Sequence, residues 1–253
     1  GVQTCALPIS GEKGGGPVKP GLPVADLTSG LWIAIGILAM LSGREKTGKG
    51  AHLDFSMLDG QVSLLTLAAA RYFALGEIPP RLGTEHPGRV PSATFRCRDG
   101  RFAHITASDQ HWAPLCKVLG IDGWGANARY ADNSSRVRYR EEVMATLAAA
   151  IAGWQRDALC DALEAAGVPA GPIKSVDEVL ADPHTIARGM TGKFDHPRVG
   201  AFPFLAMPFR FDTWEPPRAS APPMLGEHTD AILAERLGYT AERIAALRKA
   251  RAI

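Results

Sequence analysis

The longest run of apolar residues lies in the first fifth of the chain. Residues 31–41 are apolar apart from Gly36. A polar start at Asp26 and a basic end after Arg44, closed by glycine, predict a helix over about residues 27–44. The apolar run is shorter than the roughly 20 residues that a bilayer requires, so we expect a buried helix and no membrane span.

Two glycines inside this predicted helix, Gly30 and Gly36, each cost about 1 kcal/mol relative to alanine. We therefore expect another backbone to pack closely against them. After a T-G-K-G turn, apolar and polar residues alternate over residues 51–55, which predicts a short strand. Ser56 and Asp59 then form an S-x-x-D start for a second helix, which we expect to end at about residue 75, before Gly76 and two prolines.

A loop rich in glycine and proline, residues 81–92, separates this region from a different pattern. Two β-rich runs, residues 93–97 and 101–107, flank Asp99 and Gly100 and predict a hairpin. Apolar residues then recur at helical spacing in three stretches. Two further helix starts follow, one marked by a capping box and the other by an Asp-Pro pair. These elements are Trp112–Leu119, Val143–Trp154, Leu159–Ala166, Ser175 with Glu178, and Asp182 with Pro183.

The last quarter of the chain begins with seven prolines spread over residues 195–223. This density predicts an extended connector with at most one strand, at Phe209–Phe211. Two final helices are predicted at about residues 229–237 and 241–250.

Composition narrows the functional classes. The chain has 253 residues, 46% of them hydrophobic and 21% charged, with a formal net charge of +2. These values are ordinary for a soluble globular protein, so we expect neither nucleic-acid binding nor membrane association. The four cysteines form no C-x-x-C pair, which favours structural thiols in a reducing, cytoplasmic setting. They are Cys5, Cys97, Cys116 and Cys160.

The N-terminal sequence lacks the basic, apolar and small-residue segments that follow one another in a signal peptide. It begins with GVQTCALPIS, without an initiator methionine, and this stretch has little relation to the residues after it. We interpret the chain as a fragment whose first ten or so residues are not native.

Asp26 is the candidate functional residue on local grounds. It follows a loop of glycine and proline, residues 11–25, and stands at the start of the apolar helix. Backbone N–H groups and the helix dipole favour an anion at such a place. An ordinary N-cap aspartate, worth about 1 kcal/mol of stability, explains the local pattern equally well.

The wider sequence decides between these interpretations. The segment GLPVADLTSGLWIAIGILAMLSGREKTGKGAHLDFSMLDG resembles the most recognisable part of the class III CoA-transferases, the CaiB/BaiF family. The later segments GTEHPGRVPSATFRCRDGRFAHI, VPAGPIKSVDEVLADPHTIARGM and PPMLGEHTDAILAERLGY are also similar to that family. The resemblance covers nearly everything from about Gly11 to the end.

The resemblance implies an α/β fold with a Rossmann-like large domain, built from both ends of the chain, and a smaller α+β domain. Residues 1–80 would carry part of the large domain with the catalytic aspartate, and residues 81–190 the small domain. Residues 191–253 would return to the large domain. It also implies an interlocked homodimer in the complete protein. The large domain would be incomplete here, so we expect the fragment alone to be inactive and prone to aggregate.

The resemblance further implies that Asp26 is the nucleophile of coenzyme A transfer between carboxylic acids. Its carboxylate would attack an acyl-CoA to give a mixed anhydride, and the CoA thiolate would then attack the aspartyl carbonyl to give an aspartyl-CoA thioester. The acceptor acid would reverse these steps. No metal or redox cofactor is required; acyl-CoA and a small carboxylic acid are the substrates.

A loop of four residues corresponds to the active-site loop of the family and is assigned to substrate binding. Its residues are Gly83, Thr84, Glu85 and His86. Thr84 replaces the commoner asparagine of that loop. His86 would either bind a carboxylate or cap a turn, and Glu85 is interpreted as a solvated charge.

Two alternatives remain open at the level of sequence. The family resembled also contains α-methylacyl-CoA racemases, in which the aspartate works with a histidine as an acid/base pair. That activity predicts a glycine-rich segment after the aspartate, where this chain has Leu27, Thr28, Ser29 and Gly30. The other alternative is an inactive acyl-CoA-binding fragment, because most CoA-binding residues of the family precede the aspartate.

Overall fold

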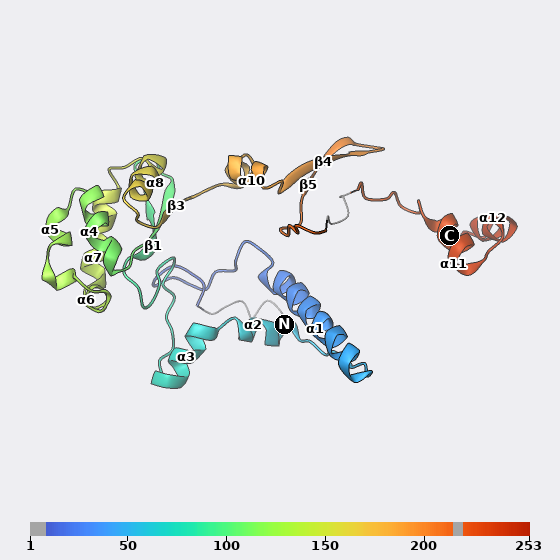
Figure 1. Ribbon diagram of the computed structural model, residues 1–253, viewed down its shortest axis with the longest axis horizontal. Helices are drawn as coiled ribbons and strands as arrows, with labels where there is room; N and C mark the ends of the chain where they lie inside the picture. Colours follow the sequence, from blue (N-terminus) through green and yellow to red (C-terminus); the bar gives the residue numbers. More distant parts are fainter. Residues whose placement is uncertain (1–8, 215–219) are drawn as a thin grey trace. The chain divides into compact units, whose positions relative to one another are not determined.

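The chain forms two compact units in the computed structural model, which describes residues 9–214 and 220–253 (Figure 1). Unit 1 extends to Ile173, and unit 2 begins at Lys174. The division into three segments predicted above, with boundaries after residues 80 and 190, concerns the complete protein and stays a prediction. Cys5 and most of the ten residues that we interpret as non-native lie outside the described residues.

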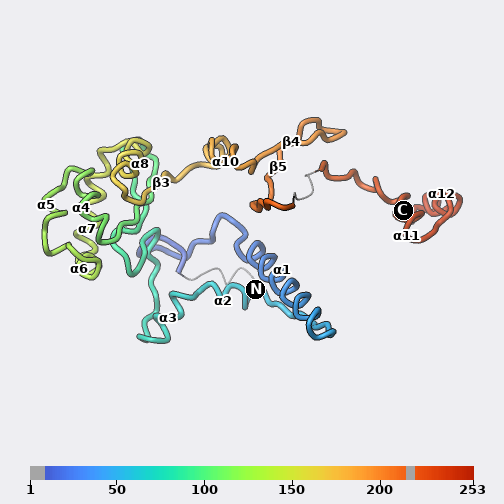
Figure 2. Tube along the Cα trace, viewed as in Figure 1, coloured from blue at the N-terminus to red at the C-terminus, as the bar shows by residue number. Residues whose placement is uncertain are grey.

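Unit 1 begins with three helices, which the Cα trace of Figure 2 follows in order. They are α1 (Val24–Thr47), α2 (Met57–Ser63) and α3 (Thr66–Leu75). The first predicted helix is confirmed, and it is longer at both ends than the apolar run indicated. The Ser56 cap is also confirmed, since its hydroxyl accepts from the Asp59 N–H at 3.4 Å.

Two expectations for this region are wrong. Residues 51–55 form no strand, because no other strand of the described chain lies beside them to complete a ladder. The helix expected to run to residue 75 is instead divided at Leu64 and Leu65, which turn the chain between α2 and α3.

A three-stranded antiparallel sheet holds the rest of unit 1 together. The predicted hairpin is confirmed as β1 (Ser92–Arg96) and β2 (Phe102–Thr106), with Ala93 opposite Ile105. Gly100 takes the left-handed conformation that the turn requires, with φ of 78°. β3 (Ala170–Ile173) pairs with β2 on its free edge.

Helices cover this sheet and form the core of unit 1. They are α4 (Asp109–Val118), α5 (Asp122–Gly125), a 3₁₀ turn (Ala128–Tyr130), α6 (Asn133–Arg138), α7 (Arg140–Ile151) and α8 (Arg156–Ala165). The inward residues of β1 and β2 pack against apolar residues at helical spacing in α4, α7 and α8. Fully buried members include Ile105, Leu115, Leu147 and Leu163. The three helical stretches predicted here are therefore confirmed.

Unit 2 contains four helices and a hairpin among its described residues. They are α9 (Val176–Leu180), α10 (Pro183–Ala187), β4 (Thr191–His196), β5 (Gly200–Leu205), α11 (Thr229–Leu237) and α12 (Ala241–Lys249). The capping box, the Asp-Pro start and both final helices are confirmed. The strand predicted at Phe209–Phe211 is wrong, because the strand lies earlier, in β5, which pairs with β4.

The described residues thus combine helices with two small antiparallel sheets. All three strand pairs among them are antiparallel. The parallel sheet of a Rossmann-like domain therefore stays a prediction.

Helix α1 is exposed, contrary to our expectation of a buried helix. Ser29 is its one buried residue, whereas Leu31, Ile35 and Leu38 are more than half exposed. A Cβ atom on Gly30 would have nothing within 4 Å of it, and one on Gly36 would meet the side chain of Leu53, not a backbone.

The argument that this segment is too short for a bilayer is also wrong. α1 is 24 residues long and apolar enough to cross a membrane by length and composition. This is weak support for a membrane span, since the core helix of a soluble protein meets the same criteria.

Candidate functional site

Asp26 lies in the first turn of α1, as its third residue. The N-cap is Pro23, so the interpretation of Asp26 as an ordinary N-cap is wrong. The first backbone hydrogen bond of the helix runs from Leu27 N–H to the Pro23 carbonyl at 3.0 Å. The N–H groups of Ala25 and Asp26 precede this bond and have no partner among the described residues.

The Asp26 carboxylate is exposed and makes no hydrogen bond or ion pair within the described part of the chain. The two hydroxyl side chains that come after it turn back to the helix: Thr28 donates to the Val24 carbonyl at 2.7 Å and Ser29 to the Ala25 carbonyl at 2.6 Å. The first turn therefore presents one carboxylate and two backbone donors that are unpaired among the described residues.

Helix α2 packs against this turn. The buried amide of Gln61 donates to the Thr28 hydroxyl at 3.1 Å. A Cβ atom on Gly60 would lie 2.8 Å from the far end of the Phe55 ring, so a larger residue there would have to displace that ring. The segment after α1 thus returns to the base of Asp26 and fixes the position of its turn.

The loop assigned to substrate binding is held by hydrogen bonds of its own. Gly83 has φ of 60° and donates to the Gly11 carbonyl at 2.9 Å. The hydroxyl of Thr84 accepts from Thr94 N–H at 3.0 Å, and His86 N–H donates to the Ser92 carbonyl at 2.9 Å. The loop is therefore fastened to the start of β1.

His86 caps a turn, which is one of the two roles considered for it. Its Nδ1 accepts from the Gly88 N–H at 3.1 Å. In the neutral imidazole the proton must then reside on Nε2, which has no partner among the described residues. The exposed ring consequently offers a donor away from the turn, so capping does not prevent carboxylate binding.

Glu85 is not a solvated charge, and that expectation is wrong. Its Oε2 lies 2.9 Å from Nη1 of Arg140, and the two side chains are 19% and 15% exposed. Arg140 also donates from Nη2 to the carbonyls of His86 and Pro87, at 2.9 and 2.7 Å.

The loop before Asp26 contacts the loop assigned to substrate binding and the residues just before it. Besides the bond from Gly83 to Gly11, Nε of Arg81 donates to the Gly15 carbonyl at 2.8 Å. Lys13 forms an ion pair with Glu141 at the start of α7, which raises the pKa of Lys13 and lowers that of Glu141. The structure thus brings the loop that leads to Asp26 into contact with the loop assigned to substrate binding. No described hydrogen bond or ion pair joins the Asp26 side chain to either loop.

Sequence reasoning missed three residues that hold the loop assigned to substrate binding and the residues that follow it. They are Asn133, Arg136 and Arg140, and each makes at least one hydrogen bond that reaches across 40 residues or more. The spacing of three residues between Asn133 and Arg136 was a signal, since it places the two polar side chains on one side of α6, whereas Arg140 begins the next helix.

Metal ligation finds no support in the part of the chain that the structure describes, where no three His, Cys, Asp or Glu side chains gather. The expectation of catalysis without a metal or cofactor stays a prediction.

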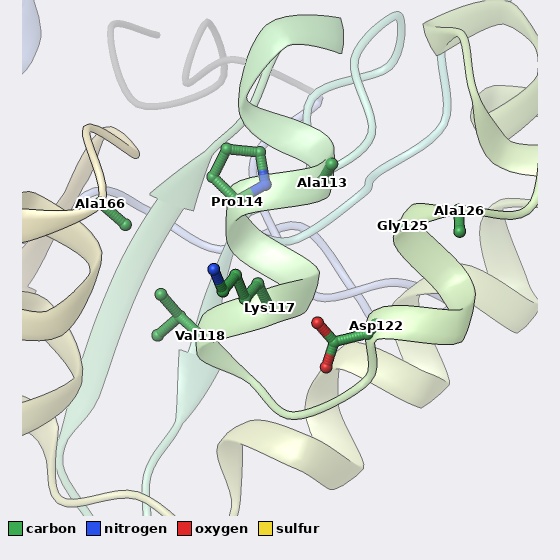
Figure 3. Close-up of a pocket in the computed structure, with 8 residues that line it drawn as sticks. All are labelled: Ala113, Pro114, Lys117, Val118, Asp122, Gly125, Ala126 and Ala166. Carbon is green, nitrogen blue, oxygen red and sulfur yellow. The ribbon is translucent and has the colours of Figure 1, made fainter.

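A hollow of about 850 Å³ opens on the surface of unit 1, between α4, α5 and the end of α8 (Figure 3). Its walls are mostly apolar; Lys117 and Asp122 are its charged residues. None of the residues assigned to the site lines it.

Comparison with known proteins identifies relatives along most of the chain. The model of CoA-transferase family III matches residues 3–229. The human succinyl-CoA:glutarate CoA-transferase is 33% identical over 231 residues, which are 91% of this chain and 53% of that protein. The succinyl-CoA:mesaconate CoA-transferase of Haloarcula marismortui is 33% identical over 230 residues, 90% of this chain and 57% of the relative.

A solved structure supports the same relationship. The crystal structure of a CaiB/BaiF family protein from Brucella suis is 37% identical, with a TM-score of 0.76 over 92% of this chain and 61% of that one. The chain spans a little over half the length of the curated relatives it matches.

Proposed function

Since this chain belongs to CoA-transferase family III, we propose that it carries the nucleophile of an enzyme that moves coenzyme A from an acyl-CoA to a carboxylic acid. The observation that carries this proposal is the Asp26 carboxylate, exposed and unpaired among the described residues, in the first turn of α1 beside two free backbone N–H groups.

The proposed reaction has two symmetrical halves. One oxygen of Asp26 attacks the thioester carbonyl of the donor, and the carbon–sulfur bond breaks to give a mixed anhydride and the CoA thiolate. The thiolate attacks the aspartyl carbonyl, which releases the donor acid and leaves an aspartyl-CoA thioester. The acceptor carboxylate then attacks that thioester, and the freed thiolate takes the acceptor acyl group from the new anhydride and regenerates Asp26.

The first turn suits a carboxylate in this role for two reasons. Its free amides lie at the positive end of the helix dipole, where a negatively charged substrate group is attracted. When the aspartyl carbonyl is attacked, negative charge develops on its oxygen, and the same amides are donors for that charge if the carbonyl turns toward them. Each step exchanges a carboxylate and the CoA thiolate at an acyl carbonyl, without any change of oxidation state, so we expect neither a metal nor a redox cofactor to take part.

We assign the acceptor acid to the loop Gly83–His86. Two of its donors have no partner in the described residues: the Thr84 N–H and the Nε2–H of His86. They suit the oxygens of a carboxylate. The loop carries one acidic group, Glu85, and the guanidinium of Arg140 neutralises it, so the loop does not repel an acid.

A dicarboxylic acid is the proposed acceptor class. Succinate, glutarate and mesaconate, the acids in the names of the two relatives above, all carry two carboxylates. This would be tested by measuring kcat/KM for a series of monocarboxylic and dicarboxylic acids with succinyl-CoA as donor. Equal values across the two classes would refute the assignment.

We further propose that the chain acts within a longer cytoplasmic polypeptide that forms an interlocked homodimer. The support is that the matched part of this chain spans 53% of the human relative, and that α1 exposes apolar side chains which a larger domain would cover. Residues 1–253 expressed alone should be inactive and elute from a sizing column as aggregates. Soluble, active transfer by this chain would overturn the proposal.

The nucleophile is tested by trapping. The longer polypeptide is mixed with succinyl-CoA, quenched in acid and digested, and the peptide containing Asp26 is weighed by mass spectrometry. We expect a CoA adduct that hydroxylamine converts to a hydroxamate. Asp26→Asn should form none, whereas Asp59→Asn, the matched third residue of α2, should form it normally. An adduct that survives in Asp26→Asn would refute the assignment.

The same preparation distinguishes a racemase. In deuterium oxide without an acceptor acid, a racemase of this family would incorporate deuterium at the α-carbon of a 2-methylacyl-CoA. We expect no incorporation.

A further inference from the structure

We propose that Arg140 is a positioning residue for the acceptor acid: its guanidinium fixes the backbone from Glu85 to Pro87 so that the donors of Thr84 and His86 point at the acceptor carboxylate. This inference rests on the proposed function. It assigns to Arg140 no contact with the substrate.

The contacts of Arg140 carry the proposal. Its two terminal nitrogens reach three successive residues of the loop: Nη1 bonds the Glu85 carboxylate at 2.9 Å, and Nη2 bonds the carbonyls of His86 and Pro87 at 2.9 and 2.7 Å. A planar guanidinium directs its donors rigidly, so these three bonds define the loop's path. A lysine would supply the charge without that geometry.

Arg140 does not act alone, since two further side chains hold the rest of the loop. Asn133 accepts from Val90 N–H at 3.1 Å and donates to the Gly88 carbonyl at 2.9 Å. Buried Arg136 donates from Nε to the Val90 carbonyl at 2.8 Å. Together the three side chains anchor residues 85–90 to α6 and α7, which belong to the packed core of unit 1.

The neighbour of Arg140 connects the same helix end to the nucleophile's side of the site. Glu141 pairs with Lys13, in the loop that leads to Asp26. The first two residues of α7 therefore hold one loop each. A displaced acceptor loop should affect attack by the acceptor acid, whereas formation of the Asp26 adduct from the donor should continue.

This difference between the acceptor step and the donor step gives the test, which is made on the longer polypeptide with succinyl-CoA and glutarate. In Arg140→Lys we expect the acceptor KM to rise roughly ten-fold, and in Arg140→Ala roughly a hundred-fold, as for a reacting group displaced by about 1 Å. The rate at which the Asp26–CoA adduct forms without acceptor should stay within about two-fold of the parent.

Arg138→Lys is the matched control. Arg138 is exposed at the end of α6 and makes no hydrogen bond or ion pair in the described residues, so its acceptor KM should not change. Circular dichroism and Tm establish that each variant is folded.

The outcomes separate the two proposals. An unchanged acceptor KM in Arg140→Ala, with normal adduct formation, would overturn the positioning role and leave the proposed function intact. Equal losses of adduct formation and acceptor turnover would also overturn it, because they would show a general structural role. Absence of the adduct in the parent would instead refute the proposed function itself.

Discussion

Removing the buried guanidinium of Arg136 gives the sharpest test of the fold. Its side chain is fully buried, and its donors reach three backbone carbonyls and one carboxylate. The bonds are to Val90 at 2.8 Å, Tyr130 at 2.8 Å, Ala131 at 3.0 Å and Asp109 at 2.6 Å. Arg136→Met retains most of the apolar stem and removes every donor.

The expected loss of stability depends on which of these acceptors water can reach once the guanidinium is removed. Val90 and Tyr130 are buried, so their carbonyls lose their donor without replacement, at about 1–3 kcal/mol each. Asp109 is 59% exposed, so solvent screening limits the ion pair to about 1 kcal/mol or less. The guanidinium also lies 5.1 Å from the Trp112 ring centroid, a contact that methionine largely replaces. The expected total is about 3–5 kcal/mol.

Native-state hydrogen exchange of β1 and β2 measures this loss locally. A destabilisation of about 3–5 kcal/mol speeds exchange of the most protected amides by about 100-fold to about 4,000-fold, since about 1.4 kcal/mol is ten-fold. Arg138→Met, which removes an exposed arginine two residues away, should change exchange by less than about three-fold. A rise of under about five-fold in Arg136→Met would show that water satisfies both carbonyls and would refute the reasoning.

Two further predictions concern the thiols and the loop. Burial raises the pKa of Cys116 to about 12, and the pKa values of Cys97 and Cys160 also rise mainly by burial. The raised pKa of Cys116 contributes stability that is complete below the ordinary thiol pKa of 9.0 and is lost as pH rises toward 12. In the native protein Cys116 should therefore resist alkylation by iodoacetamide at about pH 8. Rapid alkylation at that pH would contradict the prediction. Gly83→Ala places a Cβ in the left-handed region, 3.0 Å from a Glu12 carboxylate oxygen. It should weaken the loop by about 1–2 kcal/mol, seen as faster exchange of the His86 amide, while Gly88→Ala, which has ordinary contacts, should leave that exchange unchanged.

Local signals predicted the elements that are complete within a few residues. The Asp99-Gly100 turn, the Ser56 cap and the capping box of Ser175 with Glu178 all appear where the pattern placed them. Each depends on a backbone conformation or a hydrogen bond between residues no more than three apart. Such features need no distant partner, so the sequence alone is sufficient to predict them.

Strand predictions failed where pairing with another strand decided whether a strand forms. Residues 51–55 have an alternating pattern but no adjacent strand among the described residues, and remain irregular. Conversely, β3 contains Pro172 and β5 contains Pro203, which argued against strands. Both are tolerated because each strand pairs on one side only, so proline's missing N–H costs no ladder bond on the free side.

The candidate site was predictable in part for the same reason. Gly83 could be expected from its turn, whereas the pairing of Glu85 with Arg140 joins residues 55 positions apart. Nothing in the neighbourhood of Glu85 distinguishes it from a solvated charge. The role of Asp26 came from the resemblance of a long segment, since its immediate surroundings are equally those of a structural aspartate.

Two properties of helix α1, the position of Asp26 and the exposure of its apolar side chains, have one explanation. The helix carries the proposed nucleophile in its first turn, and it exposes apolar residues on several sides, including Leu31, Trp32 and Ile33. A thioester-transferring site must exclude water, and an apolar helix must be covered; a protein domain packed over α1 would do both at once. A bilayer would cover the apolar residues, but it would not supply donors to Asp26 or a binding site for CoA. We therefore interpret the exposed face of α1 as the surface against which the remainder of the proposed CoA site is built.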